Sequence, residues 1–259
     1  MIRLTYLLRR QPDVSRIEFQ KYWHEVHGPL IAGLARKLGI LRYVQVHTIL
    51  DESKNEQHSG VRGKMENAYD GVEEIWWNNR NEMVEGLNSS VGNKIWQTII
   101  EDEKRFIDLP NSPLWFNYEY PQVNPYPENI VATEFSLLIK SYYAIRHLNS
   151  LSLEQAQLYW RTFHGYLIRR IATGGLIKRY IQVHRYDDEM ELYMRKSHGT
   201  IIAPYIGYAE LWFNQNELDG TAPEINMGWE LAVEDESKFI DFARSSMWYG
   251  KEHVFVDYR

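Results

Sequence analysis

The feature that most constrains this chain is an internal repeat. Residues 15–47 align with residues 152–184 at a constant offset of 137 positions, with no gap. Each copy carries Trp-x-x-x-His-Gly and then Arg-Tyr-[Val/Ile]-Gln-Val-His. Self-similarity at a fixed spacing is the signature of a duplicated structural unit. We therefore expect two similar units joined head to tail.

Shared motifs extend the repeat over most of the chain. They begin at Tyr69 and Tyr205, at Glu101 and Glu234, and at Trp115 and Trp248. Proline recurs between the copies, at Pro121 and Pro125, which is typical of an extended connection. We place the boundary near residue 125. The predicted domains are an N-terminal unit, residues 1–124, and a C-terminal unit, residues 125–259.

Each copy predicts the same order of elements. Short apolar strands open the copies, and we align Leu4–Arg9 with Phe135–Lys140. Ser15 with Glu18, and Ser152 with Gln155, have the spacing of a helix-capping box. We expect Gly28-Pro29 to interrupt the first helix, because proline lacks the N–H donor. The later elements are strands at 41–47 and 71–77, a helix ending at 106–108, and a strand near 115–120.

This β-α-β-β-α-β order is the ferredoxin-like arrangement. Helices on one face of a four-stranded sheet leave its other face uncovered. Two units in one chain can close those faces against each other. The predicted fold class is therefore α+β, with two ferredoxin-like units packed sheet to sheet as an intramolecular barrel.

Strand alternation predicts which side chains enter the space between the sheets. Tyr43, Gln45 and His47 share one face of their strand, and Val44 and Val46 share the other. We expect the valines to pack on the helices, so that the polar side chains face inward. The same reasoning sends inward Tyr180, Gln182 and His184, and from the third strands Glu74, Trp76, Glu210 and Trp212.

Histidine is the natural candidate for acid–base chemistry, because its unperturbed pKa lies near neutrality. We expect His47 or His184 to carry the proton and Glu74 or Glu210 to set its tautomer. The alternative for the glutamates is a buried hydrogen bond without chemistry. The predicted substrate-binding residues are Tyr43, Gln45, Trp76, Tyr180, Gln182, Trp212, Trp23, Trp160, His27 and His164. For His27 and His164 the alternative is a helix C-cap.

Composition excludes several classes of protein. A net charge of −6 argues against nucleic acid as a partner, and the absence of cysteine excludes disulfides and thiolate chemistry. No apolar stretch reaches the roughly 20 residues of a membrane helix, so we expect no membrane partner and a cytoplasmic protein. Aromatic residues make up 14%, which fits either a large core or a pocket for a flat ring.

A metal site is not expected from the sequence. His27, His47 and Glu74 could converge in principle, but they lack a metal-ligand spacing on the predicted inward faces. His24 and His27 form an i, i+3 pair, and Arg161 replaces His24 in the second copy. We therefore predict neither a metal nor another cofactor.

These motifs resemble the EthD family of the dimeric α+β barrel superfamily. The resemblance rests on Tyr22–Pro29 and Arg42–His47, and on Tyr159–Gly165 and Arg179–His184 in the second copy. The second copy departs at Tyr166, where the family pattern has proline. The resemblance implies a ferredoxin-like unit that pairs sheet to sheet, here within one chain. It also implies relatives that act as cofactor-independent dehydratases and decarboxylases on aromatic polyketides.

Three functions follow for testing. The first is a cofactor-independent lyase or isomerase that acts on an aromatic small molecule. The second is a cofactor-free oxygenase, since the superfamily also contains monooxygenases, lactone isomerases and haem enzymes. The third is a binding protein without catalysis. A homodimer is compatible with each of them, and fold alone does not choose among them.

Overall fold

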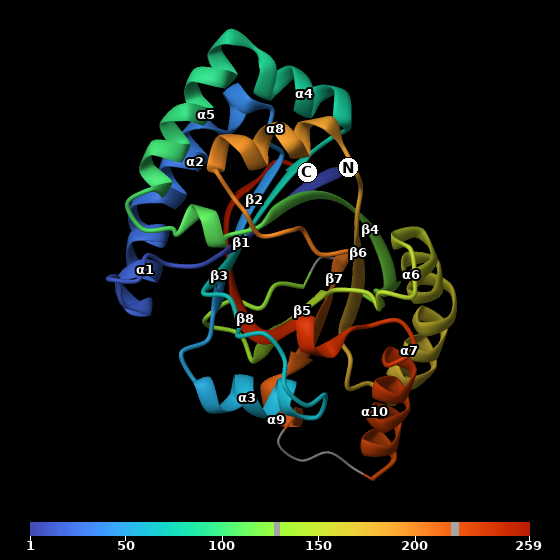
Figure 1. Cartoon of the computed structure of the whole chain (residues 1–259). Coiled ribbons are helices and arrows are strands. Elements are labelled where there is room, and N and C mark those ends of the chain that lie inside the picture. Colours follow the sequence, from blue (N-terminus) through green and yellow to red (C-terminus); the bar gives the residue numbers. More distant parts are fainter. Residues whose placement is uncertain (127–129, 219–222) are drawn as a thin grey trace.

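The computed structural model describes residues 1–126, 130–218 and 223–259. Within these residues, eight strands close into one antiparallel barrel surrounded by helices (Figure 1). The strands are β1 (Ile2–Leu8), β2 (Arg42–Thr48), β3 (Gly71–Trp77), β4 (Leu114–Val123), β5 (Leu138–Ile145), β6 (Arg179–Arg185), β7 (Gly207–Asn214) and β8 (Ser246–Asp257). The α+β class predicted from the sequence is confirmed.

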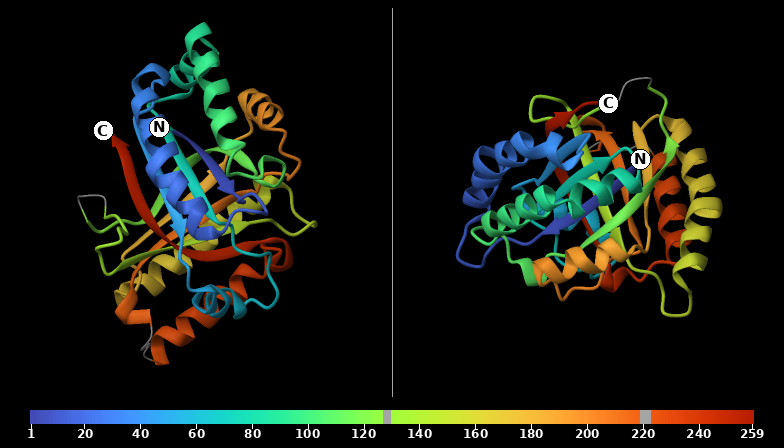
Figure 2. Two further views of the ribbon diagram at one scale, coloured as in Figure 1. Left: turned by 90° about the vertical axis from the view of Figure 1, so that its left-hand side faces the viewer. Right: turned by 90° about the horizontal axis from the view of Figure 1, so that it is seen from above.

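The helices lie on the outside of the barrel (Figure 2). The first half contributes α1 (Arg16–Tyr22), α2 (Gly28–Leu34), α3 (Glu52–Gly60), α4 (Arg80–Asn88) and α5 (Ser90–Glu103). The second half contributes α6 (Leu153–Tyr159), α7 (Gly165–Ile171), α8 (Glu189–His198), α9 (Gln215–Leu218) and α10 (Pro223–Glu236). Short 3₁₀ turns are η2 (Ala35–Leu38), η3 (Leu109–Asn111), η5 (Ala172–Gly174) and η6 (Phe242–Arg244). None of the helices in the described ranges is long and apolar enough to cross a membrane.

Strand pairing follows the same order in both halves. The order is β4-β1-β3-β2 in residues 1–124 and β8-β5-β7-β6 in residues 125–259. The barrel closes because β2 pairs with β8 and β4 pairs with β6. The predicted interior therefore exists, but inside one continuous sheet rather than between two separate ones. β4 runs through Pro121 to Val123, with a register shift at Pro121, so the connection starts later than that proline suggested.

The strand that opens the second half was misplaced in the sequence alignment. β5 begins at Leu138, and Phe135 before it is 99% exposed. The pairing registers make Thr5 equivalent to Tyr142, since they lie opposite Glu74 and Glu210. The offset of 137 positions therefore applies to the first strand as well, and Arg3 corresponds to Lys140. A short apolar run alone does not fix the register of a strand.

The first helix of each half begins as predicted and continues further than predicted. Ser15 and Ser152 form complete capping boxes with Glu18 and Gln155. The chain then passes through a π-helical turn, η1 (Trp23–His27) or η4 (Trp160–His164), directly into α2 or α7. Pro29 occupies the first turn of α2, where a missing N–H is tolerated. Gly28-Pro29 therefore does not interrupt the helical path.

Two helices cross from one half to the other. α3 belongs to the first half in sequence but packs beside β8, and α8 belongs to the second half but packs beside β4. The colours of Figure 1 make this exchange visible, with blue α3 among red elements and orange α8 among blue and green ones. Side chains anchor both helices, because Asn55 accepts a hydrogen bond from the Tyr249 amide at 2.8 Å and Asn93 donates to Tyr193 at 2.7 Å.

Candidate functional site

The second strand of each half faces the opposite way from the prediction. Val44 and Val46 lie in the barrel interior, in a cluster with Trp76 and Trp115. Tyr43 packs instead with Phe19 and the outer helices. In the second half Ile181 and Val183 face the interior and Tyr180 faces the helices. Gln45, Gln182, His47 and His184 accordingly lie on the helix side, apart from Glu74 and Glu210.

The π-helical turns explain this orientation. Gln45 Nε2 donates to the Trp23 carbonyl oxygen at 2.8 Å, and its Oε1 accepts from His47 Nε2 at 3.0 Å. Trp23 stacks on the His47 ring at 4.6 Å. The same contacts recur as Gln182 to the Trp160 carbonyl at 2.9 Å, Gln182 to His184 at 3.1 Å, and Trp160 on His184 at 4.5 Å. Polar side chains face the helices here because they satisfy backbone groups of the π turn.

Glu74 and Glu210 lie inside the barrel in a network of ion pairs. Lys140 Nζ lies 3.0 Å from Glu74 Oε1 and 2.6 Å from Glu210 Oε1. Arg3 contacts both carboxylates as well. Burial raises the pKa of Glu74, whereas Arg3 and Lys140 outweigh burial and hold the pKa of Glu210 well below its usual range. This matches the alternative of a buried network, which ties the two halves together.

The predicted aromatic residues of the third strands border this network. Trp76 donates from Nε1 to Glu119 at 2.6 Å, and Trp212 donates to Glu252 at 2.9 Å. The Arg3 guanidinium lies 4.4 Å from the Trp76 ring centre. Both tryptophans are 2% exposed. They therefore act as packing and hydrogen-bonding partners of the central charges.

A cavity of about 840 Å³ lies in the second half, between the outer face of its sheet and the helices. Among the predicted residues Trp160, His164 and Tyr180 line it. Its apolar wall consists of side chains from β5, β7, β8, α7 and α10, including Ile139, Leu211, Phe213, Ile168, Val233 and Met247. This volume lies within the roughly 300–1,000 Å³ of small-molecule sites, which are mostly apolar with a few placed polar groups.

His164 lines this cavity, and a hydrogen bond at one of its ring nitrogens fixes which nitrogen carries the proton. Its Nδ1 lies 2.9 Å from Asp235 Oδ2, on α10. Burial acts to raise the pKa of Asp235, but hydrogen bonds from His164, Tyr159 and Lys238 hold it at about 2. Asp235 is therefore a carboxylate that accepts the Nδ1–H, and Nε2 is the basic nitrogen. An acid that fixes a histidine tautomer in this way is a recurring element of acid–base sites.

Further polar groups enter the cavity from the crossing segment that contains α3. Arg62 makes two hydrogen bonds to Glu236, at 2.6 and 2.8 Å. His58 Nε2 lies 2.7 Å from Ser141 Oγ, and its ring stacks on Tyr249 at 3.9 Å. Burial, with Arg62 nearby, lowers the pKa of His58 to about 3. The cavity is thus completed by a segment from the other half of the chain.

The equivalent space in the first half is filled. Side chains of α4, α5 and α8 pack there, namely Met83, Leu87, Trp96, Ile99, Met190 and Met194. His27 Nδ1 donates to Asp102 at 2.8 Å, and its Nε2 lies 3.4 Å from Glu73. Burial opposes its charge, but bonds with Asp102 and Glu73 raise the pKa of His27 to about 10. His27 is therefore a buried imidazolium, and His164 is its counterpart beside a cavity.

His47 and His184 lie outside the set of cavity-lining residues. Burial lowers the pKa of His47 well below neutrality and that of His184 to about 3. Asp235 and Arg62 are residues of this site that the sequence did not predict. A signal existed for the first, because Asp102 and Asp235 occupy the same place in the repeated Glu-Asp-Glu motif. No pattern in the sequence connects Arg62 with the second half.

The fold defines a class of protein, the closed antiparallel α+β barrel with outer helices. A structure of a monooxygenase candidate from Fusobacterium nucleatum is similar, with a TM-score of 0.50 and 7% identity over 98% of this chain and 93% of that one. A structure of a monooxygenase candidate from Lactobacillus acidophilus has a TM-score of 0.48 and 8% identity, over 99% of this chain and 95% of that one. A structure of a mutant chlorite dismutase from Candidatus Nitrospira defluvii has a TM-score of 0.43 and 8% identity, over 96% of this chain and 91% of that one. At these identities the likeness concerns the fold alone.

A comparison of the sequence with protein-family models gives a more specific result than the comparison of folds. Residues 11–110 match the model of the EthD domain. This match lies within the first half and confirms the resemblance seen in the motifs of that half. No curated protein matches the chain.

Proposed function

We propose that this protein is a cofactor-independent lyase or isomerase whose site is the cavity of the second half, with His164 as the proton carrier. The observation that carries the proposal is the His164–Asp235 pair at the wall of a mostly apolar cavity of about 840 Å³. Trp160 and Tyr180 place two aromatic rings in the cavity wall. Aromatic rings make favourable stacked or edge-to-face contacts with one another, so a flat ring is the favoured ligand. This moves the acid–base role from His47 and His184 to His164.

The proposed chemistry is the transfer of one proton through His164 Nε2. In a dehydration, Nε2 removes a proton from a carbon next to a carbonyl group, and the electron pair of that C–H bond forms a C=C bond. The neighbouring C–O bond breaks, and hydroxide leaves as water with the proton that His164 returns. Asp235 stabilises the intermediate imidazolium without taking its proton. General acid–base catalysis of this kind contributes roughly 10²–10⁴-fold to rate.

The substrate class is an aromatic molecule with at least one polar substituent. The rings and aliphatic side chains of the wall suit an apolar body, and Lys54, Gln57 and the Arg62–Glu236 pair supply polar contacts. Because Glu236 balances Arg62, a phenol or ketone fits this end better than a strong anion would. A buried polar group needs such a partner.

The first experiment measures binding and turnover of a panel of phenols and aromatic ketones. Quenching of tryptophan fluorescence reports binding, because Trp160 and Trp229 line the cavity. Mass spectrometry identifies the product, and an oxygen electrode distinguishes a lyase from an oxygenase. We expect binding, loss of water or CO₂ from a substrate, and no oxygen uptake.

The matched variants are His164→Ala and His58→Ala, which alter two histidines of the same cavity. We expect His164→Ala to bind the ring and lose turnover, and His58→Ala to keep turnover. If His164→Ala stays active while His184→Ala is inactive, the assignment to His164 is wrong. Binding without any product would favour the non-catalytic alternative.

We also propose that the chain is a tandem EthD protein of two ferredoxin-like units, residues 1–124 and 125–259. The shared strand order, the paired capping boxes and the paired π turns support this division. The two halves already enclose a barrel within one chain. Sedimentation analysis would show whether a homodimer adds to it.

A further inference from the structure

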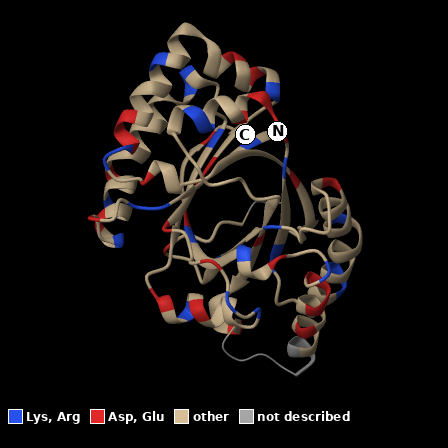
Figure 3. Ribbon diagram, in the orientation of Figure 1, with Lys and Arg blue, Asp and Glu red and all other residues tan. Residues whose placement is uncertain are grey.

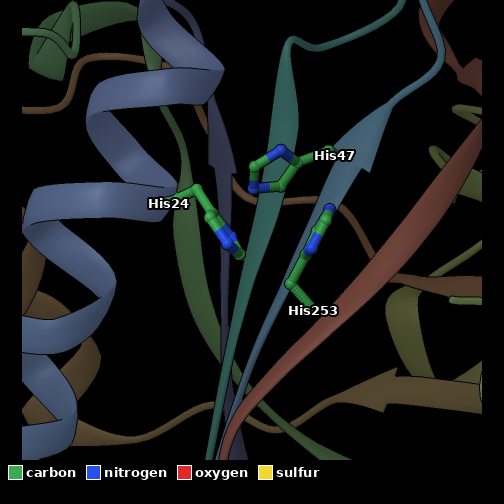
Figure 4. Close-up of side chains that lie close together, drawn as sticks. All are labelled: His24, His47 and His253. Atoms are coloured by element: carbon green, nitrogen blue, oxygen red, sulfur yellow. The ribbon is translucent and has the colours of Figure 1, made fainter. Parts of the chain in front are cut away.

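Three histidines from separate elements converge at the edge of the first half, away from the cavity. His24 lies on η1, His47 on β2 and His253 on β8 (Figure 4). Their ligand nitrogens lie within 4.8 Å of one another. The ring centres of His47 and His253 are 4.1 Å apart, and those of His24 and His253 are 4.7 Å apart.

We propose that His24, His47 and His253 bind a divalent transition-metal ion, with Zn²⁺ as the best-suited one. Three imidazoles and an open fourth position are a ligand set that zinc uses in proteins. Zn–N bonds of about 2.0–2.1 Å place tetrahedral nitrogens roughly 3.4 Å apart. The cluster therefore needs a contraction of little more than an ångström, which side-chain rotation supplies. The sequence had predicted no metal, because strand pairing between β2 and β8 was needed to bring His253 here.

The rigidity of the site comes from the neighbouring strands. β2 and β8 pair so that His253 lies opposite Gln45, beside His47. His24 is exposed on the surface of η1, where its side chain is free to move toward the other two. Two fixed ligands and one mobile one leave an open path for an ion from solvent.

The hydrogen bonds around His47 prepare it as a ligand. Gln45 Nε2 donates to the Trp23 carbonyl and to the Tyr43 hydroxyl, each at 2.8 Å, so its Oε1 must face His47. His47 Nε2 therefore carries the proton that it donates to Oε1, and Nδ1 keeps its lone pair. Metal-binding histidines commonly donate their second N–H to an oxygen in this way. Glu134 Oε1 also lies 3.8 Å from His253 Nε2 and adds negative charge at the rim.

The other half holds a natural control at the corresponding positions. Arg161, His184 and Tyr120 replace His24, His47 and His253, because Tyr120 lies opposite Gln182 as His253 lies opposite Gln45. The Arg161 guanidinium lies 5.1 Å from the Tyr120 ring centre, and that ring lies 4.8 Å from His184. The second half therefore has a positive charge and a phenol ring at the two positions where the first half has His24 and His253.

A second group of ligand-type side chains is less suitable. His27, Glu73 and Glu103 also bring their atoms close together, and all three are buried. Glu73 already accepts from Trp23 and Tyr43, and Glu103 Oε2 lies 3.1 Å from His198 Nε2. These carboxylates are balanced by protonated histidines and have no opening to solvent.

The experiment titrates metal-free protein with Co²⁺ and Zn²⁺. We expect about one ion per chain, with visible Co²⁺ ligand-field bands that Zn²⁺ abolishes. His24→Ala should weaken binding roughly tenfold or more, since the affinity depends on each ligand. His24→Ala with His253→Ala should abolish it. Arg161→Ala, at the matching position of the other half, should keep the same stoichiometry and affinity.

Two results would overturn the proposal. One is wild-type protein that takes up no ion and shows no Co²⁺ bands. The other is the double variant binding as tightly as the wild type, which would place the ion elsewhere. Circular dichroism and thermal unfolding of each variant confirm that it is folded. The exposed position of His24 makes its variant a test that does not depend on core packing.

Discussion

The spaces between sheet and helices differ between the two halves, although the strands that border them pair in the same order. Strand register relates Leu4 to Ser141, Glu73 to Ala209 and Trp77 to Phe213. At each pair the second half has the smaller side chain. Smaller side chains on one wall leave volume that the backbone does not reclaim. A core and a cavity are thus made on one framework by changing side chains on the same strands.

The covering helices extend this difference. α8 places Met190 and Met194 into the first half, where they complete an apolar core. α3 instead presents Lys54, Gln57 and His58 to the cavity of the second half. Figure 3 shows Lys, Arg, Asp and Glu interspersed over the outer helices of both halves. The contrast therefore concerns the side chains that point into these two spaces, which make a packed core in the first half and a cavity in the second.

The largest expected effect concerns the two equivalent histidines. His164→Ala should lower kcat by about 10²–10⁴-fold once a substrate is found, because the proton carrier is lost. Asp235→Asn should lower it less and shift the pH profile, since it changes the preferred tautomer of His164. Steady-state kinetics across pH measures both. Equal activity of His164→Ala and wild type would remove the functional side of the comparison.

His27→Ala should mainly affect stability. Removing this buried cation leaves Asp102 and Glu73 without it, and breaking a buried pair costs about 3–5 kcal/mol. Urea unfolding measures the loss. His164→Ala should cost less, because its ring borders a cavity where water can replace it. If the two variants lose the same free energy, the two histidines are not in different environments.

The same histidine predicts a pH dependence. Its folded pKa is about 10 and lies above the ordinary value of 6.5. Its stabilisation is therefore complete below about pH 6.5, declines as the pH rises, and is lost above about pH 10. The difference in unfolding free energy between wild type and His27→Gln should shrink over this range. A difference that stays constant with pH would mean that His27 is neutral in the folded protein.

Ala209→Leu tests the cavity directly. The added side chain enters the space that Glu73 occupies in the first half, so ligand binding should weaken by roughly tenfold or more, a loss of about 1.4 kcal/mol. Cavity filling commonly adds about 0.5–2 kcal/mol of stability. Fluorescence titration and thermal unfolding give the two readings. Tight binding to a normally folded Ala209→Leu protein would place the ligand elsewhere.

The smallest effect should be the same in both halves. Ser15→Ala and Ser152→Ala each remove a side-chain cap in a complete capping box. Each should cost about 1 kcal/mol of unfolding free energy. Calorimetry of the two variants measures how alike the first helices are. A much larger loss for one of them would show that its helix supports its half more than the repeat suggests.

The capping boxes and the inward direction of Glu74 and Glu210 could be predicted from the sequence. Prediction failed for the second strands, because both faces of β2 are buried and alternation then carries no sign of which is which. The assumption that valine packs on the helices was wrong, since Gln45 and Gln182 each donate a second hydrogen bond to a π-turn carbonyl that already accepts from a backbone N–H. Long-range partners, such as Arg62 with Glu236, depend on the crossing segment and have no local signal.

The crossing of α3 and α8 has a consequence for how this molecule can be divided. Each half lends a helix to the other, which is the reciprocal exchange seen in domain-swapped dimers, here within one chain. If the chain were cut near residue 125, neither half would keep all the helices that cover its own strands. The two fragments should instead remain associated after cleavage, because each still contributes a helix to the other. Either half produced without the other would expose a barrel edge and an apolar face, and both favour aggregation.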